Sequence, residues 1–344
     1  MILLLRVKKK FSVGGQALIE GIMMKGPEKT AIAVRTPEKE IDIKYVEEKH
    51  LKDKYPIFGA FLIRGVVNLI ESMIEGYKAL MYSADKSGMT DLEEENKNKV
   101  ENLSAEEKEQ KTKEKKKKES LIINIAMIVG SVLGVVLSFF LFMYVPALLF
   151  DGLEFVTNGA TPDKLRPLFE GVLKIAVFVG YIAAVSKMND IKRVFMYHGA
   201  EHKTIFCLEK GLELTVDNVR KQMRFHPRCG TSFMILMLVV SILVSLITVT
   251  LFPGITKYRI LWVLIKIMLV PLSCGVGYEL IKLCGKYDNK ITRIIAAPGL
   301  WVQRLTTKEP EDDMIEVAIA SIIAVLPEGE ASKEAENSEE GLEN

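Results

Sequence analysis

The sequence predicts a mainly α, polytopic membrane protein with about four transmembrane helices, a small N-terminal β-rich cytoplasmic module and interfacial amphipathic helices. Three observations lead to this fold class. Hydrophobic residues make up 49% of the 344 residues and collect in long blocks. Residues 30–45 contain two runs that alternate between apolar and polar side chains, as strands do. Residues 57–83 and 311–326 carry apolar residues at helical spacing with polar residues opposite them.

Three apolar blocks are long enough to cross a bilayer, since about 20 helical residues cover roughly 30 Å of hydrocarbon. They are residues 121–150, 232–252 and 260–281. Residues 168–187 are a weaker candidate because Glu170 and Lys174 interrupt the apolar run. The i,i+4 spacing of these two side chains lets them pair near the membrane interface. We therefore predict four spans, with a buried soluble helix as the alternative for residues 168–187.

The distribution of lysine and arginine predicts how the spans are oriented. Residues 187–228, between the second and third spans, hold nine basic residues, and residues 111–118 ahead of the first span are rich in lysine. The other two loops between spans hold two basic residues each. Because cytoplasmic loops carry an excess of basic residues, both termini and the loop at 188–231 are predicted to be cytoplasmic.

The N-terminal module contains a predicted hairpin. Residues 30–35 and 40–45 are the alternating runs, and the turn sequence TPEK lies between them. Ahead of the hairpin, the sequence GGQALIEGIMMKGP at residues 14–27 combines spaced glycines with the carboxylate of Glu20. Glycine permits a positive φ or a close approach of the backbone. This segment therefore either wraps a site or forms a bulged strand with turns.

Amphipathic and charged segments complete the predicted domain order. The helix predicted at 57–83 either lies in the membrane interface or penetrates the membrane. The predicted domains are a β-rich cytoplasmic module at 1–55, an amphipathic interfacial helix at 56–90, a charged linker at 91–120, the first two spans at 121–187, a cytoplasmic His/Cys loop at 188–231, the last two spans at 232–281, a cytoplasmic interfacial segment with an amphipathic helix at 282–327 and a disordered acidic tail at 328–344.

The sequence YHGAEHK at residues 197–203 is the main functional clue, because three of the four histidines of the chain lie between residues 198 and 229. In a helix, His198 and His202 share one face with Glu201 beside them. The pattern H-x-x-E-H is a zinc-enzyme signature in which the histidines bind the ion and the glutamate is the general base. The sequence HPRCG at 226–230 adds His226 and Cys229. In a reducing compartment Cys229 is a ligand, a nucleophile or core filler rather than half of a disulfide.

Three interpretations of this group stay open. His198, His202 and His226 could hold zinc, or another divalent transition metal, with Glu201 as the catalytic base. Cys229 could instead join the three imidazoles and close a structural site. The third interpretation is that the side chains only pack and form hydrogen bonds in a basic loop.

Three other carboxylates could support such a site. Asp190 precedes the histidines by one to two helical turns and could accept a hydrogen bond from a ligand imidazole. Glu279 lies at the end of the fourth predicted span, where an ionisable side chain needs a partner or a wet cavity. Glu20 lies in the glycine-rich N-terminal segment.

Several motifs together resemble the YqhQ-like family of bacterial multi-pass membrane proteins. They are GGQA at 14–17, EGIMM at 20–24, YHGAEHK at 197–203, HPRCGTS at 226–232, YELI at 278–281 and PGLW at 298–301, and the resemblance runs from about Phe11 to about Leu326. The family is of unknown function and carries the label of predicted metal-dependent enzyme. The resemblance implies a bacterial source, a location in the cytoplasmic membrane and the same multi-pass fold.

Three hypotheses on function follow. The first is a bacterial inner-membrane protein with a metal site, most simply zinc, on its cytoplasmic face and a metal-dependent hydrolase activity. The alternative is a non-enzymatic scaffold or accessory factor for another membrane or ribosome-associated machine, with a structural metal or none. A transporter is the third, suggested by four charged side chains in or beside spans: Glu170, Lys174, Lys266 and Glu279. The expected partners are the lipid bilayer and a second membrane protein or a second copy, and the sequence carries no nucleic-acid-binding motif.

Overall fold

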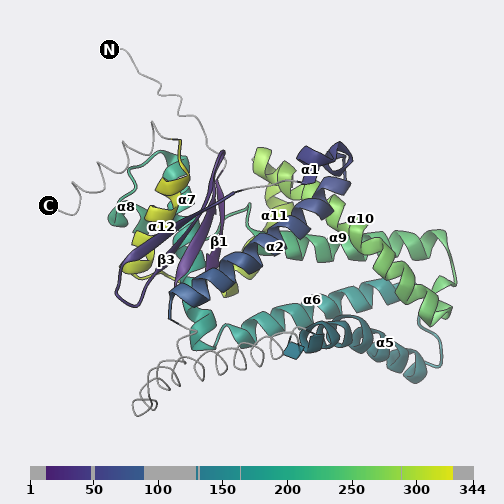
Figure 1. Ribbon diagram of the computed structural model, residues 1–344. Coiled ribbons are helices and arrows are strands. Elements are labelled where there is room, and N and C mark those ends of the chain that lie inside the picture. Colours follow the sequence, from purple (N-terminus) through teal and green to yellow (C-terminus); the bar gives the residue numbers. More distant parts are fainter. Residues whose placement is uncertain are drawn as a thin grey trace, which may run out of the picture. The chain divides into compact units, whose positions relative to one another are not determined.

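The computed structural model describes residues 13–47, 51–88, 129–130, 132–162, 164–287 and 289–327. It confirms a mainly α, polytopic protein with a small antiparallel sheet near the N-terminus (Figure 1). The predicted linker at 91–120 and tail at 328–344 lie outside the described residues. The chain forms two compact units: the sheet unit of residues 1–88, 179–244 and 267–344, and the helical unit of residues 89–178 and 245–266.

The sheet is a four-stranded meander in the order β1-β2-β3-β4. Its strands are β1 (Gly14–Leu18), β2 (Gly21–Lys25), β3 (Thr30–Arg35) and β4 (Ile41–Val46). The predicted hairpin is confirmed as β3 and β4, paired antiparallel from Thr30–Val46 to Arg35–Ile41. The glycine-rich segment forms a second hairpin, and Glu20 takes a φ of 48° in its tight turn.

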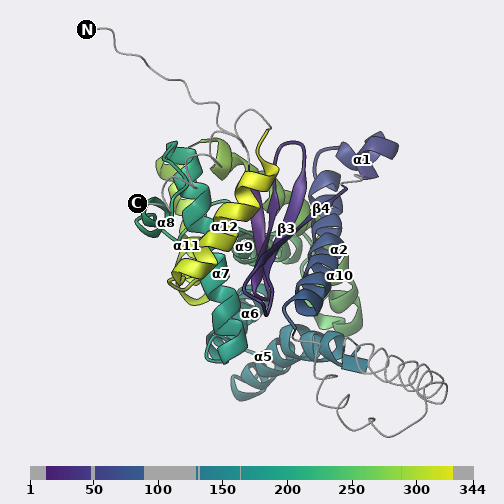
Figure 2. The ribbon, with the colours of Figure 1, turned by 60° about the vertical axis from the view of Figure 1, so that its left-hand side comes forward.

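Helices cover both faces of the sheet. One face, with Ile22, Met24, Ala31 and Ala33, forms a common core with α7 (Asn189–Lys210) and α12 (Asp312–Val325). The other face, with Leu18, Met23, Ile32 and Val34, packs against α2 (Ile63–Lys86). Figure 2 shows α12 and α2 on opposite sides of the strands. Side chains of a strand alternate between faces, and the apolar run of β3 at residues 31–34 is buried on both faces of the sheet.

The helices predicted around the sheet are present with adjusted ends. The predicted helix at 311–326 is α12, and its apolar side lies on the sheet. The helix predicted at 57–83 begins six residues later, at Ile63, because the backbone turns sharply at Leu62 with a φ of 68°. The short 3-10 helix η1 (Pro56–Gly59) precedes that turn.

Four helices in the described part of the chain are long and apolar enough to cross a membrane, as predicted. They are Val132–Val156, Leu165–Val185, Gly230–Leu251 and Ile260–Lys286. Their elements are the π-helix η3 (Phe140–Tyr144), α5 (Val145–Val156), α6 (Leu165–Val185), α9 (Gly230–Leu251) and α10 (Arg259–Lys286). The remaining elements are α1 (Leu51–Lys54), α8 (Val216–Arg220), η4 (Ile255–Lys257) and α11 (Lys290–Thr306).

Charged side chains in the spans have different partners from those expected from spacing. In the helical unit, Glu170 is buried and bonds to Arg166 at 3.1 Å and to Lys266 at 2.8 Å, rather than to Lys174. In the sheet unit, both carboxylate oxygens of Glu279 accept hydrogen bonds from Arg64 of α2, at 2.6 and 2.5 Å. Long-range ion pairs therefore account for Glu170, Lys266 and Glu279, three of the four charges that suggested a transport pathway.

Candidate metal centre

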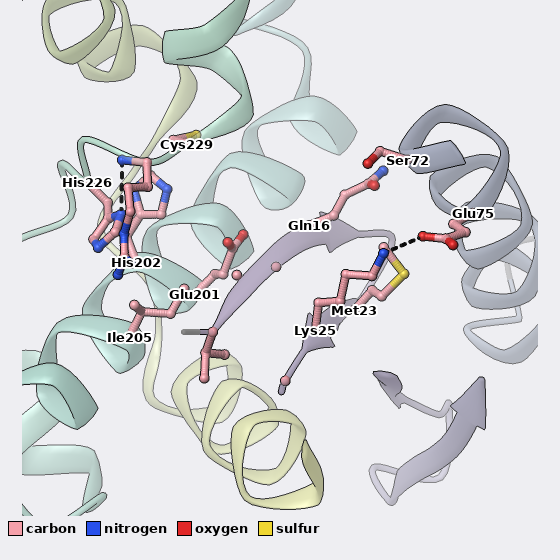
Figure 3. Close-up of a pocket in the computed structure, with 15 residues that line it drawn as sticks. Gln16, Met23, Lys25, Ser72, Glu75, Glu201, His202, Ile205, His226 and Cys229 are labelled. Atoms are coloured by element: carbon pink, nitrogen blue, oxygen red, sulfur yellow. Dashed lines mark hydrogen bonds and ion pairs between the residues drawn. The ribbon is translucent and has the colours of Figure 1, made fainter. Parts of the chain in front are cut away.

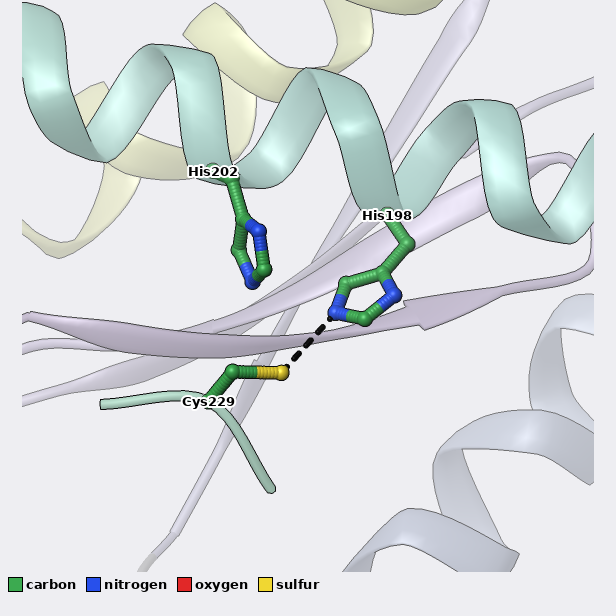
Figure 4. A group of neighbouring side chains, drawn as sticks. All are labelled: His198, His202 and Cys229. Carbon is green, nitrogen blue, oxygen red and sulfur yellow. Dashed lines mark hydrogen bonds between the residues drawn. The ribbon is translucent and has the colours of Figure 1, made fainter. Parts of the chain in front are cut away.

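Helix α7 presents His198 and His202 on one face, as the four-residue spacing predicts. The two imidazole rings lie with their centroids 4.4 Å apart. Both point at Cys229, which comes from the segment just ahead of α9 (Figure 4). The Nε2 atom of His198 lies 3.1 Å from the Cys229 Sγ atom. One donor atom from each of the three residues lies within 4.8 Å of the others.

Two main-chain carbonyls fix the orientation of the imidazoles. The Nδ1–H of His198 donates to the carbonyl of Thr306 at 2.8 Å, and that of His202 donates to the carbonyl of Arg224 at 2.5 Å. A carbonyl can only accept, so Nδ1 must carry a hydrogen in both rings. The Nε2 atoms of both rings are thereby directed at Cys229. Such an outer hydrogen bond on a ligand imidazole is usual in metal sites.

The charges of His198 and Cys229 stabilise each other. Burial alone would raise the pKa of the Cys229 thiol, but the neighbouring His198 and His202 imidazoles hold it well below its usual value. Burial would likewise lower the pKa of His198, yet the Cys229 thiolate outweighs it and raises that pKa to about 9. Burial and the charge of His198 lower the pKa of His202. These opposite shifts favour a thiolate on Cys229 beside an imidazolium on His198 in the metal-free protein, and the thiolate is the form that binds metal.

The three donors fit a transition metal. In a tetrahedral zinc site with Zn–N near 2.0–2.1 Å and Zn–S near 2.3 Å, the ligand atoms are roughly 3.3–3.6 Å apart. The distance of 3.1 Å between His198 Nε2 and Cys229 Sγ lies just below that range, and all three donor atoms lie within 4.8 Å of one another. Two imidazoles and a thiolate also form a donor set that suits zinc. The three donors are therefore close enough together to share one ion.

Glu201 lies next to the cluster on the same helix and is buried. Its Oε2 atom has no hydrogen-bond partner among the described residues. Burial raises the pKa of its carboxyl to about 8, against the charge of His198 and a hydrogen bond from the Gly15 backbone N–H. A Cβ atom on Gly15 would lie 3.0 Å from the Glu201 Cδ atom. Glycine is therefore needed for β1 to approach this carboxylate.

A cavity of about 340 Å³ in the sheet unit joins these residues to the sheet and to α2. Figure 3 shows Glu201, His202 and Cys229 on one side and Gln16, Ser72 and Glu75 on the other. The cavity is lined by Val13, Gly14, Gly15, Gln16, Met23, Lys25, Gly26, Ser72, Glu75, Glu201, His202, Ile205, His226, Arg228 and Cys229. The glycine-rich segment thus supplies both a strand of the sheet and a wall of the cavity.

The structure does not bring His226 into the three-residue cluster. The His226 ring lies 5.8 Å from that of His202, its Nε2 atom is 3.4 Å from Glu209, and its Nδ1 atom accepts the Arg228 backbone N–H. Burial lowers the pKa of His226 to about 4, so the ring is neutral. His226 borders the cavity, whereas Cys229 faces the two helical imidazoles.

The supporting carboxylates have roles other than those suggested by the sequence. Asp190 is exposed in the first turn of α7, and main-chain carbonyls serve as the acceptors for the ligand imidazoles. Glu20 binds Arg193 through both oxygens, at 2.5 and 2.6 Å, and accepts a hydrogen bond from Tyr197 at 3.2 Å. Glu20 therefore holds α7 against the β1–β2 turn. Glu279 joins α10 to α2 through Arg64.

Gln303 of α11 is a structural residue that the sequence did not single out. Its side chain accepts the His226 backbone N–H and donates to the His226 carbonyl and to the Ser232 hydroxyl, each at 2.7 Å. These bonds bracket the segment that carries Cys229. A glutamine in an amphipathic helix gives no local signal of such a role, because its partners are more than 70 residues away.

The fold and the cluster define a polytopic membrane protein with a candidate His–His–Cys metal centre beside a buried glutamate. The model of a family described as protein of unknown function (DUF1385) matches residues 61–328. The uncharacterized protein YqhQ of Bacillus subtilis (strain 168) is 34% identical over 316 residues, which cover 91% of this chain and 92% of that protein. The chain belongs to this DUF1385 family, and the resemblance to YqhQ is confirmed. No solved structure matches the chain.

Proposed function

We propose that the protein is a membrane-bound, metal-dependent hydrolase that holds one zinc ion, or another divalent transition metal, through His198, His202 and Cys229. The observation that carries the proposal is the convergence of two oriented imidazoles and a thiolate beside a buried carboxylate with an unpartnered oxygen. Three protein ligands leave a coordination position open, as in catalytic zinc sites. A structural site would be closed by a fourth ligand.

Each residue has a part in the proposed chemistry. A bound zinc ion would polarise a substrate carbonyl or phosphoryl group and make water more acidic. Glu201 would act as general base, because it lines the cavity beside the ligands and its Oε2 atom has no hydrogen-bond partner among the described residues. The charge of a bound ion would favour its carboxylate form and so oppose the burial that raises its pKa. Gly15 would position Glu201 through its backbone N–H. We place this site at the cytoplasmic face of the membrane, because the basic residues cluster in the loop that contains it.

Metal analysis of the purified full-length protein tests the proposal. We expect about one equivalent of a transition metal in the parent, and X-ray absorption should report two nitrogen ligands and one sulfur ligand at zinc distances. His202→Ala and Cys229→Ala should lose the metal. His226→Gln is the matched control, since this histidine lies outside the cluster, and it should keep the metal. A parent protein without metal would refute the proposal.

Glu201→Gln separates a catalytic site from a structural one. The amide has nearly the same size as the carboxyl group and cannot act as a base, so this variant should bind metal as the parent does. It should lose hydrolysis of any ester, amide or phosphoester that the parent cleaves. If the parent binds metal but cleaves none of these substrate classes, the site is structural and the scaffold hypothesis is favoured.

A further inference from the structure

Helix α2 has its apolar side on the outside. Large apolar side chains on one side of the helix are exposed, among them Met73 (65%) and Tyr77 (58%), together with Ile63, Ile70, Ile74 and Leu80. The opposite side faces the protein and buries small or polar residues, including Gly65, Gly76 and Ser83. A helix on a water-soluble surface has the reverse arrangement, with charged residues outward. The outer side of α2 is therefore suited to contact with lipid.

The start of α2 is joined to a membrane span. Gly65 lies so close to α10 that a Cβ atom there would be 3.0 Å from the Gly275 Cα atom. Asn68 donates to the Tyr278 hydroxyl at 2.8 Å, one turn beyond the Arg64–Glu279 pair. All these partners belong to the span Ile260–Lys286. The start of α2 therefore packs directly against a helix that is long and apolar enough to cross the membrane.

The inner side of α2 forms a wall of the cavity. Ser72 and Glu75 line it, and Glu75 binds Lys25 of β2 at 2.8 Å (Figure 3). One helix, roughly 10–12 Å thick with its side chains, separates this polar lining from the outward apolar side chains. With the outer side of α2 in contact with lipid, the cavity would lie within about one helix diameter of the bilayer.

Helix α11, like α2, has large apolar side chains on its outer side and polar side chains on its inner side. It exposes Ile291, Ile294 and Trp301 and buries Gln303 and Thr306. The carbonyl of Thr306 orients His198, so this helix also links an outward apolar side to the metal cluster. Two helices of the sheet unit therefore have an apolar outer side and an inner side that supports the site.

We propose that the cavity takes the polar head group of a membrane lipid, with the acyl chains lying along the outer side of α2. This inference rests on the proposed function and names its substrate class. Two cationic side chains line the cavity, Lys25 and Arg228, and each is held there by an ion pair, with Glu75 and Glu209 respectively. Glu201 would act as general base on the water that hydrolyses a bond within the head group. A water-soluble substrate would need no apolar face beside the cavity.

An apolar diazirine that partitions into lipid tests the position of α2. The full chain is reconstituted in nanodiscs of phosphatidylethanolamine and phosphatidylglycerol, irradiated and mapped by mass spectrometry. Met73, Ile74 and Tyr77 should be labelled to the same extent as the spans, whereas α12, which packs in the core, should stay unlabelled. Labelling of α2 at the low level of α12 would overturn the proposal, because another segment or water would then cover its outer side.

A phosphatidylethanolamine with a diazirine on its head group tests the cavity. Peptides containing residues 14–25 should be labelled in the parent and lose that label in Ser72→Trp, which narrows the cavity at an exposed position. Lys78→Trp, on the same helix but outside the cavity lining, should keep the label. A parent that binds zinc but is not labelled in the cavity would overturn the lipid inference and leave the metal centre standing. A parent protein that binds no zinc or other transition metal would instead refute the proposed function.

Discussion

The backbone N–H of Gly15, in the first strand, donates a hydrogen bond to the carboxyl group of Glu201, in helix α7. These two residues are far apart in the sequence and belong to the two motifs that stand out in it. Their contact joins the glycine-rich strand directly to the histidine helix. The donor is a main-chain group, and the absence of a side chain at Gly15 leaves room for the carboxyl group beside it.

Gly15→Ala should disturb Glu201 without removing a metal ligand. The added Cβ atom would lie 2.8 Å from the Met23 carbonyl oxygen and 3.0 Å from the Glu201 carboxyl. Such overpacking costs roughly 1–3 kcal/mol of stability. We expect a lower unfolding temperature, retained metal and reduced hydrolysis. Gly14→Ala is the control, because nothing lies within 4 Å of a Cβ atom there, and equal effects at both positions would contradict the prediction.

Gln303→Met should loosen the segment that carries Cys229. The substitution removes three hydrogen bonds and leaves the His226 backbone N–H and carbonyl without these partners. A buried polar group without a partner costs roughly 1–3 kcal/mol. Chelator competition should show weaker zinc binding, and thermal unfolding should show lower stability. Arg304→Met, at the exposed neighbouring position, should change neither.

Zinc should stabilise the folded protein through the three-residue cluster. A ligand at about 100 times its dissociation constant stabilises the folded state by roughly 2.7 kcal/mol. Thermal unfolding with increasing zinc should therefore shift upward in the parent and in His226→Gln. The shift should be absent in Cys229→Ala. A similar shift in all three proteins would place the stabilising site elsewhere.

Glu170→Gln should destabilise the helical unit. It would leave Lys266 buried without the carboxylate that now binds it at 2.8 Å, and it would remove one partner of Arg166. Breaking a buried ion pair by removing one partner costs roughly 3–5 kcal/mol. The double variant Glu170→Gln with Lys266→Met should recover part of the loss in thermal unfolding measurements. No recovery would mean that Lys266 is not the side chain that needs Glu170.

Much of the fold could be predicted because its signals are local. Apolar length located the four spans, and alternation located β3 and β4, since both depend only on neighbouring residues. The predicted start of α2 was wrong because no glycine or proline marks the backbone turn at Leu62. The pairing of Glu170 with Lys174 was also wrong. Lys266 lies 96 residues from Glu170, and no sequence spacing indicates such a contact.

The candidate site was predictable to the extent that it lies on one helix. The spacing of His198 and His202 places both rings on one face, and Cys229 was among the proposed ligands. The exclusion of His226 from the cluster depends on the path of a loop, which Glu209 and Gln303 determine through long-range contacts. Asp190 was predicted to accept a hydrogen bond from a ligand imidazole, but main-chain carbonyls are the acceptors. Every residue has such a carbonyl, so the sequence cannot indicate which one is used.

The two carbonyls that orient the imidazoles have a consequence for how this site tolerates change. A substitution at Arg224 or Thr306 alters the side chain but keeps the main-chain carbonyl that accepts the hydrogen bond. The orientation of the two imidazoles therefore depends on the path of the backbone and not on these side chains. A motif transplanted onto another helix would carry the histidines but not these acceptors, which lie 22 and 108 residues away from their imidazoles. In a mutational scan, His198 and His202 should therefore be intolerant of substitution, whereas the partly exposed Arg224 should accept other side chains and the buried Thr306 should accept those of similar size.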